Sequence, residues 1–243
     1  VMNTDNMSIL GLTIDYGPYG WLEPYEFGWT PNTTDRQNKR YRYGNQPHIG
    51  LWNLYQLANA LYPLIEEVEP LEEILESYKT NYEIKSTDMM RSKLGLKTAI
   101  ESDEELILSL NKNLQASETD MTIFFRNLSQ FEKELPEKGI EVVQEAFYEP
   151  KAVQGKLLDQ WSQWFEMYSN RLKDEALSYD QRKEQMNKVN PKYVLRNYMA
   201  QMAIDKADNG DYSLIEEFYQ ILKKPYDEQP NSEQWFAKRP EWA

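Results

Sequence analysis

The strongest constraint on the fold is the spacing of apolar residues between positions 47 and 222, which recur mostly three and four residues apart. This period places them on one face of an α-helix, whereas a half-buried strand needs strict alternation. The sequence therefore predicts a mainly helical protein. The expected helices cover residues 47–61, 66–94, 103–114, 118–131, 155–179, 191–209 and 212–222.

Several residues have predicted roles in these helices. Trp52 lies on the apolar face of the first helix and is expected in the core, as are Trp161 and Trp164. Ser117 and Asn190 precede helical patterns and are expected to be N-caps. A second buried stripe is expected in the helix over residues 66–94, at Leu71, Ile74, Leu75, Tyr78, Tyr82, Met89 and Leu94. The prolines and glycine within residues 132–151 predict an internal linker or long loop, and the two tryptophans after position 234 are expected to dock the tail.

Residues 1–46 hold five of the ten glycines and three prolines, which predicts mostly loop and turn. Within residues 9–14, apolar residues interrupted by Gly11 predict two short strands that fold back and bring Asp15 near Asn6. Together with Asp5, these side chains offer the hard oxygen ligands that Mg²⁺ prefers. Plain turn chemistry explains the same Asp and Asn residues, so the residues by themselves leave both interpretations open.

Composition excludes several functional classes. A net charge of -13 argues against a DNA- or RNA-binding surface. With no cysteine and one histidine, the chain has no disulfide, thiolate metal site or His-rich cluster of its own. It contains no run of 18 apolar residues, so we expect neither a membrane nor a nucleic acid as partner.

The continuous segment 2–20, MNTDNMSILGLTIDYGPYG, resembles the signature of the selenoprotein O family, kinase-fold proteins once called pseudokinases. The resemblance extends over nearly the whole chain. It continues through Asn45–Pro47, Leu51–Leu54, Phe124–Arg126, Asn190–Tyr198 and Arg239–Ala243.

This resemblance implies a mainly α fold, the C-terminal lobe of a protein kinase with a short β element at its N-terminus. Residues 1–46 would form the catalytic and metal-binding loop segment, and residues 47–243 the helical C-lobe and C-terminal extension. The implied activity is that of a Mg²⁺-dependent protein adenylyltransferase, which passes AMP from ATP to Ser, Thr or Tyr hydroxyls of proteins. Asp5 matches the general base, Asn6 a Mg²⁺ ligand, and Asp15 the ligand of Mg²⁺ and of the nucleotide phosphates.

The family's other nucleotide contacts belong to an N-terminal lobe that this sequence does not contain. We therefore expect that lobe of the same protein as a partner, beside ATP and protein substrates, and expect this chain to be inactive by itself. The implied location is the cytoplasm in a bacterium or the mitochondrion in a eukaryote.

Two alternatives remain at this stage: a conventional kinase, or a catalytically dead kinase-like binding scaffold. Asp5 and Asn6 are adjacent, whereas an ordinary kinase separates its base from its metal ligand by several residues. Lys192 and Arg196, four residues apart, are predicted either to meet an acidic substrate or nucleotide, or to bond carbonyls of a neighbouring loop.

Overall fold

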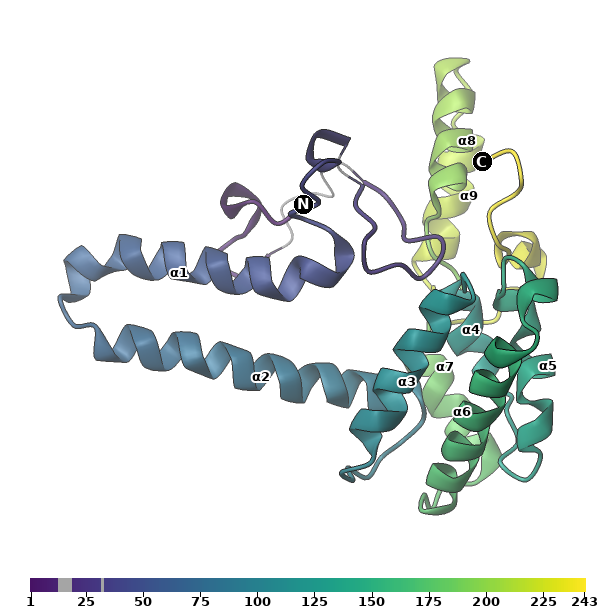
Figure 1. The fold of residues 1–243 in the computed structure, drawn as a ribbon. Coiled ribbons are helices and arrows are strands. Elements are labelled where there is room, and N and C mark those ends of the chain that lie inside the picture. Colours follow the sequence, from purple (N-terminus) through teal and green to yellow (C-terminus); the bar gives the residue numbers. More distant parts are fainter. Residues whose placement is uncertain (13–18, 32) are drawn as a thin grey trace. The chain divides into compact units, whose positions relative to one another are not determined.

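The computed structural model describes residues 1–12, 19–31 and 33–243 and is mainly helical, as predicted. Figure 1 labels the helices in chain order. Their bounds are α1 (Gln46–Ile65), α2 (Glu69–Lys93), α3 (Asp103–Ala116), α4 (Met121–Leu128), α5 (Gly139–Val143), α6 (Lys156–Lys173), α7 (Tyr179–Val189), α8 (Asn197–Asp208) and α9 (Ser213–Leu222). Such a fold is consistent with a kinase-like C-lobe.

The short β element expected near the N-terminus is not found in the described part of the chain. Residues 8–11 instead form a turn, in which the Gly11 amide donates to the Ser8 carbonyl at 3.0 Å. Gly11 has a φ of 69°, a left-handed conformation that disfavours continuing a strand at this point. Among the described residues the β structure is limited to one isolated bridge, between Thr119 and Phe147.

The chain forms two compact units. Unit 1 comprises Val1–Leu22 and Glu26–Asp88, and unit 2 comprises Glu23–Tyr25 and Met89–Ala243. The division predicted between residues 46 and 47 separates the chain by role, whereas these units separate it by compactness. The predicted division therefore stays a prediction.

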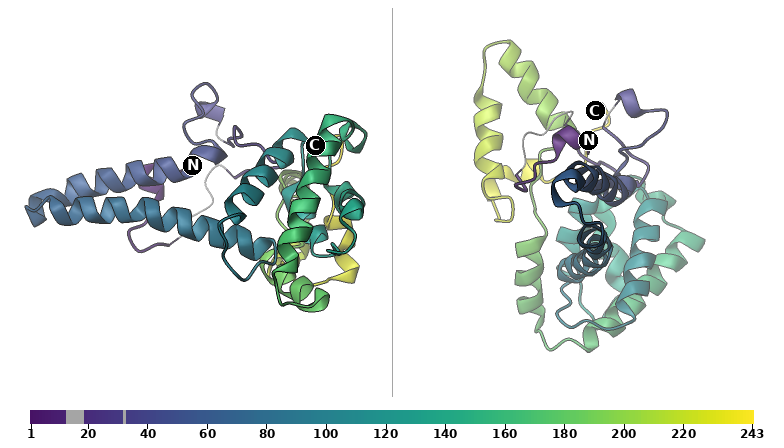
Figure 2. Two further views of the ribbon diagram at one scale, coloured as in Figure 1. Left: turned by 60° about the horizontal axis from the view of Figure 1, so that its bottom comes forward. Right: turned by 90° about the vertical axis from the view of Figure 1, so that its left-hand side faces the viewer.

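In unit 1, α1 and α2 run side by side as a hairpin (Figures 1 and 2). α1 ends at Ile65, and the next residue, Glu66, has a left-handed φ of 59° that reverses the chain. The two helices are tied together where the Tyr78 hydroxyl donates to the Pro47 carbonyl at 2.9 Å.

The prediction that Trp52 belongs to the core is wrong. Its side chain is 42% exposed, and the Arg40 guanidinium lies over its ring at 4.5 Å from the centroid. The stripe expected over residues 66–94 is only partly covered: Leu75 and Leu94 are buried, whereas Ile74, Tyr82 and Met89 are exposed. Apolar spacing identifies a helix face, but only the packing of the folded chain decides whether that face is covered.

The core of unit 2 is built around α6, as the spacing of its aromatic residues predicts. Trp161, Trp164, Phe165 and Tyr168 are fully buried. Both indole N–H groups find acceptors, since Trp161 donates to the Ser117 hydroxyl and Trp164 to the Leu106 carbonyl. Large aromatic side chains therefore supply apolar burial here with no indole donor left unpaired.

The linker predicted over residues 132–151 is wrong, because this segment packs into unit 2. It contains α5 and three 3₁₀ turns that begin at Pro136, Gln144 and Pro150. Val143, Ala146 and Phe147 are buried at 0–1% exposure. At Gly139 an added Cβ would lie 2.3 Å from the Phe165 ring, so this glycine permits close packing rather than a flexible connection.

Two predicted helix caps are also wrong. α4 is capped by Asp120, whose side chain accepts a hydrogen bond from the Ile123 amide, and not by Ser117. Asn190 lies at the C-terminal end of α7 instead of starting a helix, and α8 begins only at Asn197. The side chain of Asn190 is engaged elsewhere, because its amide donates to the Lys93 carbonyl and accepts from the Lys93 ammonium.

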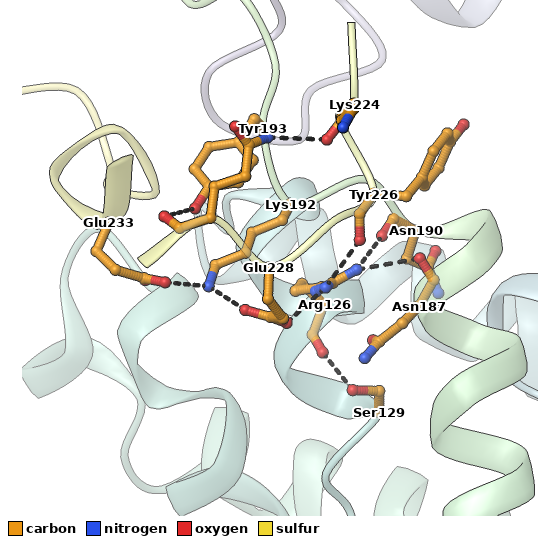
Figure 3. Close-up of polar contacts among 11 residues, drawn as sticks. Arg126, Ser129, Asn187, Asn190, Lys192, Tyr193, Lys224, Tyr226, Glu228 and Glu233 are labelled. Carbon is orange, nitrogen blue, oxygen red and sulfur yellow. Dashed lines mark hydrogen bonds and ion pairs between the residues drawn. The ribbon is translucent and has the colours of Figure 1, made fainter. Parts of the chain in front are cut away.

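Residues after α9 are fixed to unit 2 by charged groups, which Figure 3 shows. Arg126, from α4, and Lys192 both bond the carboxylate of Glu228, and Lys192 also bonds Glu233. The predicted docking of the tail is confirmed for Trp235, which is half-buried, whereas Trp242 stays 67% exposed. Trp235 packs edge-on against Phe218 and Trp242 against Tyr198.

Candidate functional site

The predicted base and metal ligand lie together on one exposed turn. Thr4–Asn6 forms a 3₁₀ turn, in which the Asn6 amide donates to the Asn3 carbonyl at 3.0 Å. The side chains of Asp5 and Asn6 are both exposed. This short turn therefore presents two adjacent polar side chains to solvent, where a substrate can reach them.

A residue of α1 holds this turn from both ends. The side-chain amide of Asn53 donates to the Met2 carbonyl at 2.8 Å and contacts the Met7 sulfur at 2.8 Å. Asn53 is only 6% exposed. This contact packs α1 against the Thr4–Asn6 turn, and the role of Asn53 was not predicted from the sequence. An asparagine on the buried side of an otherwise apolar helix is the signal that would have pointed to it.

A groove of about 640 Å³ lies beside the turn. It is lined by Thr4, Met7, Ser8, Ile9, Gly11, Trp52, Asn53, Leu54, Gln56 and Leu57. Thr4 and Met7 directly flank Asp5 and Asn6 in the chain. Its volume lies within the roughly 300–1,000 Å³ typical of small-molecule sites, and apolar walls with a few polar groups are usual there.

Asp15, the third predicted site residue, lies outside the described residues, so its approach to Asn6 stays a prediction. Within the described ranges, no three His, Cys, Asp or Glu side chains gather in a way that could hold a metal ion. One described residue, Asn6, carries an oxygen of the hard type that Mg²⁺ prefers. The side-chain nitrogen of Asn6 donates a hydrogen bond to the Val1 carbonyl at 2.9 Å. This bond identifies which end of the side-chain amide is the nitrogen and therefore which end is the oxygen, the atom that could ligate a metal.

Lys192 and Arg196 are both engaged inside unit 2. The Lys192 ammonium lies 2.5 Å from Glu228 Oε2 and 2.6 Å from Glu233 Oε1. Arg196 Nη1 lies 3.1 Å from Glu23 Oε2 and 2.5 Å from Asp120 Oδ2. The structural role anticipated for these residues is therefore the one observed, with carboxylates as partners instead of the expected carbonyls.

Burial by itself would lower the pKa of the Arg196 guanidinium, but the charges of Asp120 and Glu23 outweigh it and raise that pKa. The nearby Tyr148 phenol has a pKa above its ordinary value, first through burial and then through the same two carboxylates. Arg196 therefore stays charged and Tyr148 stays neutral at any physiological pH.

The helical fold, with its exposed Asp5–Asn6 turn beside a groove, is consistent with the class of kinase-like C-terminal lobes. The sequence profile of the protein adenylyltransferase SelO matches residues 1–223. The chain belongs to this family.

Three similar proteins are each called protein nucleotidyltransferase YdiU. The protein of Flavobacterium johnsoniae is 61% identical over the whole chain, which covers 47% of that relative. Those of Aromatoleum aromaticum and Rhodopirellula baltica are each 50% identical over the whole chain, which covers 46% and 47% of their lengths. The chain thus spans about half the length of the curated relatives it matches.

Among the residues with described positions, no helix combines the length and apolar character needed to cross a membrane.

Proposed function

We propose that this chain carries the base and metal-ligand residues of a Mg²⁺-dependent protein adenylyltransferase, which transfers AMP from ATP to Ser, Thr or Tyr hydroxyls of proteins. The observation that supports the proposal best is the pairing of Asp5 and Asn6 on an exposed turn, held by Asn53 at the border of a groove. Membership in the SelO family supports the same class of activity.

In the proposed reaction, the acceptor hydroxyl oxygen forms a bond to the α-phosphorus of ATP, and pyrophosphate leaves with the electrons of the broken P–O bond. Asp5 takes the proton of the hydroxyl, which makes the oxygen a better nucleophile. Exposure suits Asp5 to this role, because a bulky protein acceptor must reach it.

Asn6 and Asp15 would hold the metal, with Asp15 also facing the nucleotide phosphates. When bound, Mg²⁺ supplies positive charge that stabilises the triphosphate in the transition state. Asn6 is suited to contribute a neutral oxygen, and Asp15 the anionic ligand, so the two substitutions should differ in severity.

The test uses the full-length protein with ATP labelled either at the α- or at the γ-phosphate. Label from the α-phosphate only should appear on protein acceptors. Asp15→Ala should abolish both nucleotide binding and transfer, because an anionic ligand opposite a polyphosphate is lost. Asp5→Ala should keep nucleotide affinity within a few-fold and slow transfer by on the order of 10² to 10⁴.

Glu73 is an exposed carboxylate of α2, so Glu73→Ala is the matched control for the loss of a surface carboxylate. This variant should bind nucleotide and transfer AMP as wild type does. Transfer of label from the γ-phosphate alone would identify a conventional kinase. A full-length protein that binds no Mg²⁺-ATP would indicate a catalytically dead scaffold. An Asp5→Ala protein that transfers AMP at the normal rate would refute the role assigned to Asp5.

A further inference from the structure

A basic segment directly precedes α1 in unit 1. Residues 33–45 contain four basic residues and one acidic residue, a net charge of +3 in a chain whose net charge is -13. The acidic residue, Asp35, is engaged by the backbone, because its Oδ2 accepts a hydrogen bond from the Tyr41 amide at 2.7 Å. Within the described ranges, none of the four basic side chains forms an ion pair with a carboxylate. This segment therefore presents uncompensated positive charge.

Arg40 is the basic residue of this segment that is held in place most firmly. Two side chains at the start of α1 fix its backbone: Asn45 Nδ2 donates to the Arg40 carbonyl at 2.6 Å, and Gln46 Nε2 donates to the Tyr41 carbonyl at 2.5 Å. The Arg40 guanidinium carbon lies 4.5 Å from the centroid of the Trp52 ring and 5.7 Å from that of Tyr41. The charged group is therefore kept at one place on unit 1.

This stacking leaves the hydrogen-bonding groups of Arg40 free. A guanidinium packs on an aromatic ring with its flat face, whereas its N–H donors point outward in its own plane. No acceptor in the described part of the chain takes a hydrogen bond from the Arg40 guanidinium. The guanidinium groups of Arg126, Arg171 and Arg196, by contrast, each bond a carboxylate. Arg40 therefore presents a preorganised fork of donors that matches an anionic group with two oxygens.

Arg40 lies close to the turn that carries the proposed base. The hydroxyl of the next residue, Tyr41, is hydrogen-bonded to the side-chain oxygen of Asn3, which directly precedes the Thr4–Asn6 turn. Trp52, on which Arg40 stacks, lines the groove together with the first residue of that turn. The free guanidinium is therefore carried by a wall of the groove that adjoins the turn.

We propose that Arg40 binds the protein substrate: its guanidinium, stacked on Trp52, accommodates an acidic side chain close to the Ser, Thr or Tyr hydroxyl that receives AMP. This inference rests on the proposed function, which brings that hydroxyl to Asp5. The side chains of Arg36 and Lys39 are exposed and extend the positive charge along the segment. Such a distribution suits an extended acidic stretch of a protein better than a single compact phosphate group.

The experiment uses the full-length protein and pairs of synthetic peptides. Both peptides of a pair carry the same Ser, Thr or Tyr hydroxyl, flanked in one by Glu and in the other by Gln. Two quantities are measured: peptide affinity, from fluorescence anisotropy of a labelled peptide, and kcat/KM for AMP transfer to it. Wild type should prefer the Glu peptide by about 10-fold in both, the size expected of one charge-assisted hydrogen bond.

Three variants, each checked for folding by circular dichroism, test the residue. Arg40→Met should bind and modify the two peptides equally and keep the wild-type KM for ATP. Arg40→Glu should instead prefer peptides with Lys at the flanking positions, a reversal that a merely structural role of Arg40 would not produce. Lys85 is an exposed cation of α2 in the same unit, so Lys85→Met loses the same charge outside the segment and should keep the wild-type preference.

The outcomes separate this inference from the proposed function. A wild-type protein that transfers AMP equally to Glu and Gln peptides, or an Arg40→Met protein that keeps the preference, would overturn the inference and leave the proposed function intact. An unchanged preference with a raised KM for ATP in Arg40→Met would assign the guanidinium to the nucleotide phosphates instead. Binding that prefers Glu peptides through Arg40, without any AMP transfer, would support the binding surface and refute the proposed function. A wild-type protein that neither binds nor modifies the peptides would refute both.

Discussion

The side-chain amide of Asn53 lies 2.8 Å from the Met2 carbonyl oxygen, so a residue of α1 fixes a backbone position 51 residues away. The same amide contacts Met7, on the other side of Asp5 and Asn6. The Thr4–Asn6 turn is therefore held in part by a buried side chain of the neighbouring helix.

Asn53→Ala should remove this restraint and leave the Met2 carbonyl without its donor. A typical intramolecular hydrogen bond contributes about 0.5–1.5 kcal/mol, so the free energy of unfolding should fall by about 1 kcal/mol. AMP transfer should slow as Asp5 and Asn6 lose their fixed position. Urea titration and single-turnover transfer by the full-length protein measure the two effects. Asn59→Ala, an exposed asparagine of the same helix, should change neither. Equal behaviour of the two variants would contradict the role of Asn53.

Trp52→Ala should cost only about 1–2 kcal/mol, because the indole is 42% exposed and the Arg40 guanidinium over its ring contributes about 0.5–1 kcal/mol. Trp164→Ala should cost about 3–5 kcal/mol, because that side chain is fully buried and leaves a cavity. Chemical denaturation of both variants makes the comparison. If Trp52→Ala lowered the free energy of unfolding as much as Trp164→Ala, the conclusion that Trp52 lies outside the core would be wrong.

Arg126→Met should destabilise unit 2 by on the order of 3 kcal/mol, because the buried Arg126 guanidinium is the donor to several partly buried acceptors, and an acceptor left unsatisfied costs about 1–3 kcal/mol. Its loss leaves the carbonyls of Asn187, Asn190 and Tyr226 without their donor, as Figure 3 makes clear. Glu228→Gln should cost no more than about 1 kcal/mol, since the Glu228 side chain is 62% exposed. Thermal or urea unfolding measures the stability of both variants. A larger loss of stability in Glu228→Gln than in Arg126→Met would contradict the prediction.

The stabilising effect of Glu228 should depend on pH. Its partial burial favours the neutral acid, but hydrogen bonds from Lys192 and Arg126 prevail and hold its pKa below the ordinary 4.5. A carboxylate with a lowered pKa stabilises the fold above its unfolded pKa and loses this effect as the pH falls through its folded pKa. The stability difference between wild type and Glu228→Gln should thus be constant above about pH 5 and shrink below pH 4.5. Unfolding curves of both proteins across this range are the measurement, and a difference that grows on acidification would contradict the prediction.

The destabilising effect of the buried Lys93 charge should disappear as the pH rises. Burial lowers the pKa of its ammonium from 10.5 to about 8. Between these two values the unfolded chain binds the extra proton, so the free energy of unfolding increases with pH, by on the order of 3 kcal/mol in full. Lys93→Met has no titratable group at this position, so its stability is the reference for the pH dependence of wild type. The stability of wild type relative to Lys93→Met should rise between about pH 8 and 10.5, and an unchanged difference would show that the ammonium is not shielded.

The sequence by itself determined the helical class and the place of most helices, because a period of three and four is a local property of the chain. α6 illustrates this, since the spacing of Trp161 and Trp164 identified both the helix and its buried face. The resemblance carried by residues 2–20 likewise identified Asp5, Asn6 and Asp15 as candidates before any contact was known.

Only the tertiary structure decided which apolar faces are covered and which charges pair. Trp52 and Trp164 have the same spacing signal, yet one is exposed and the other buried, because coverage depends on elements that the local pattern does not contain. Arg196 finds Glu23 across 173 positions, and Asn53 finds Met2 across 51. Such partners depend on how distant segments meet when the core packs, and no periodicity within either segment records them.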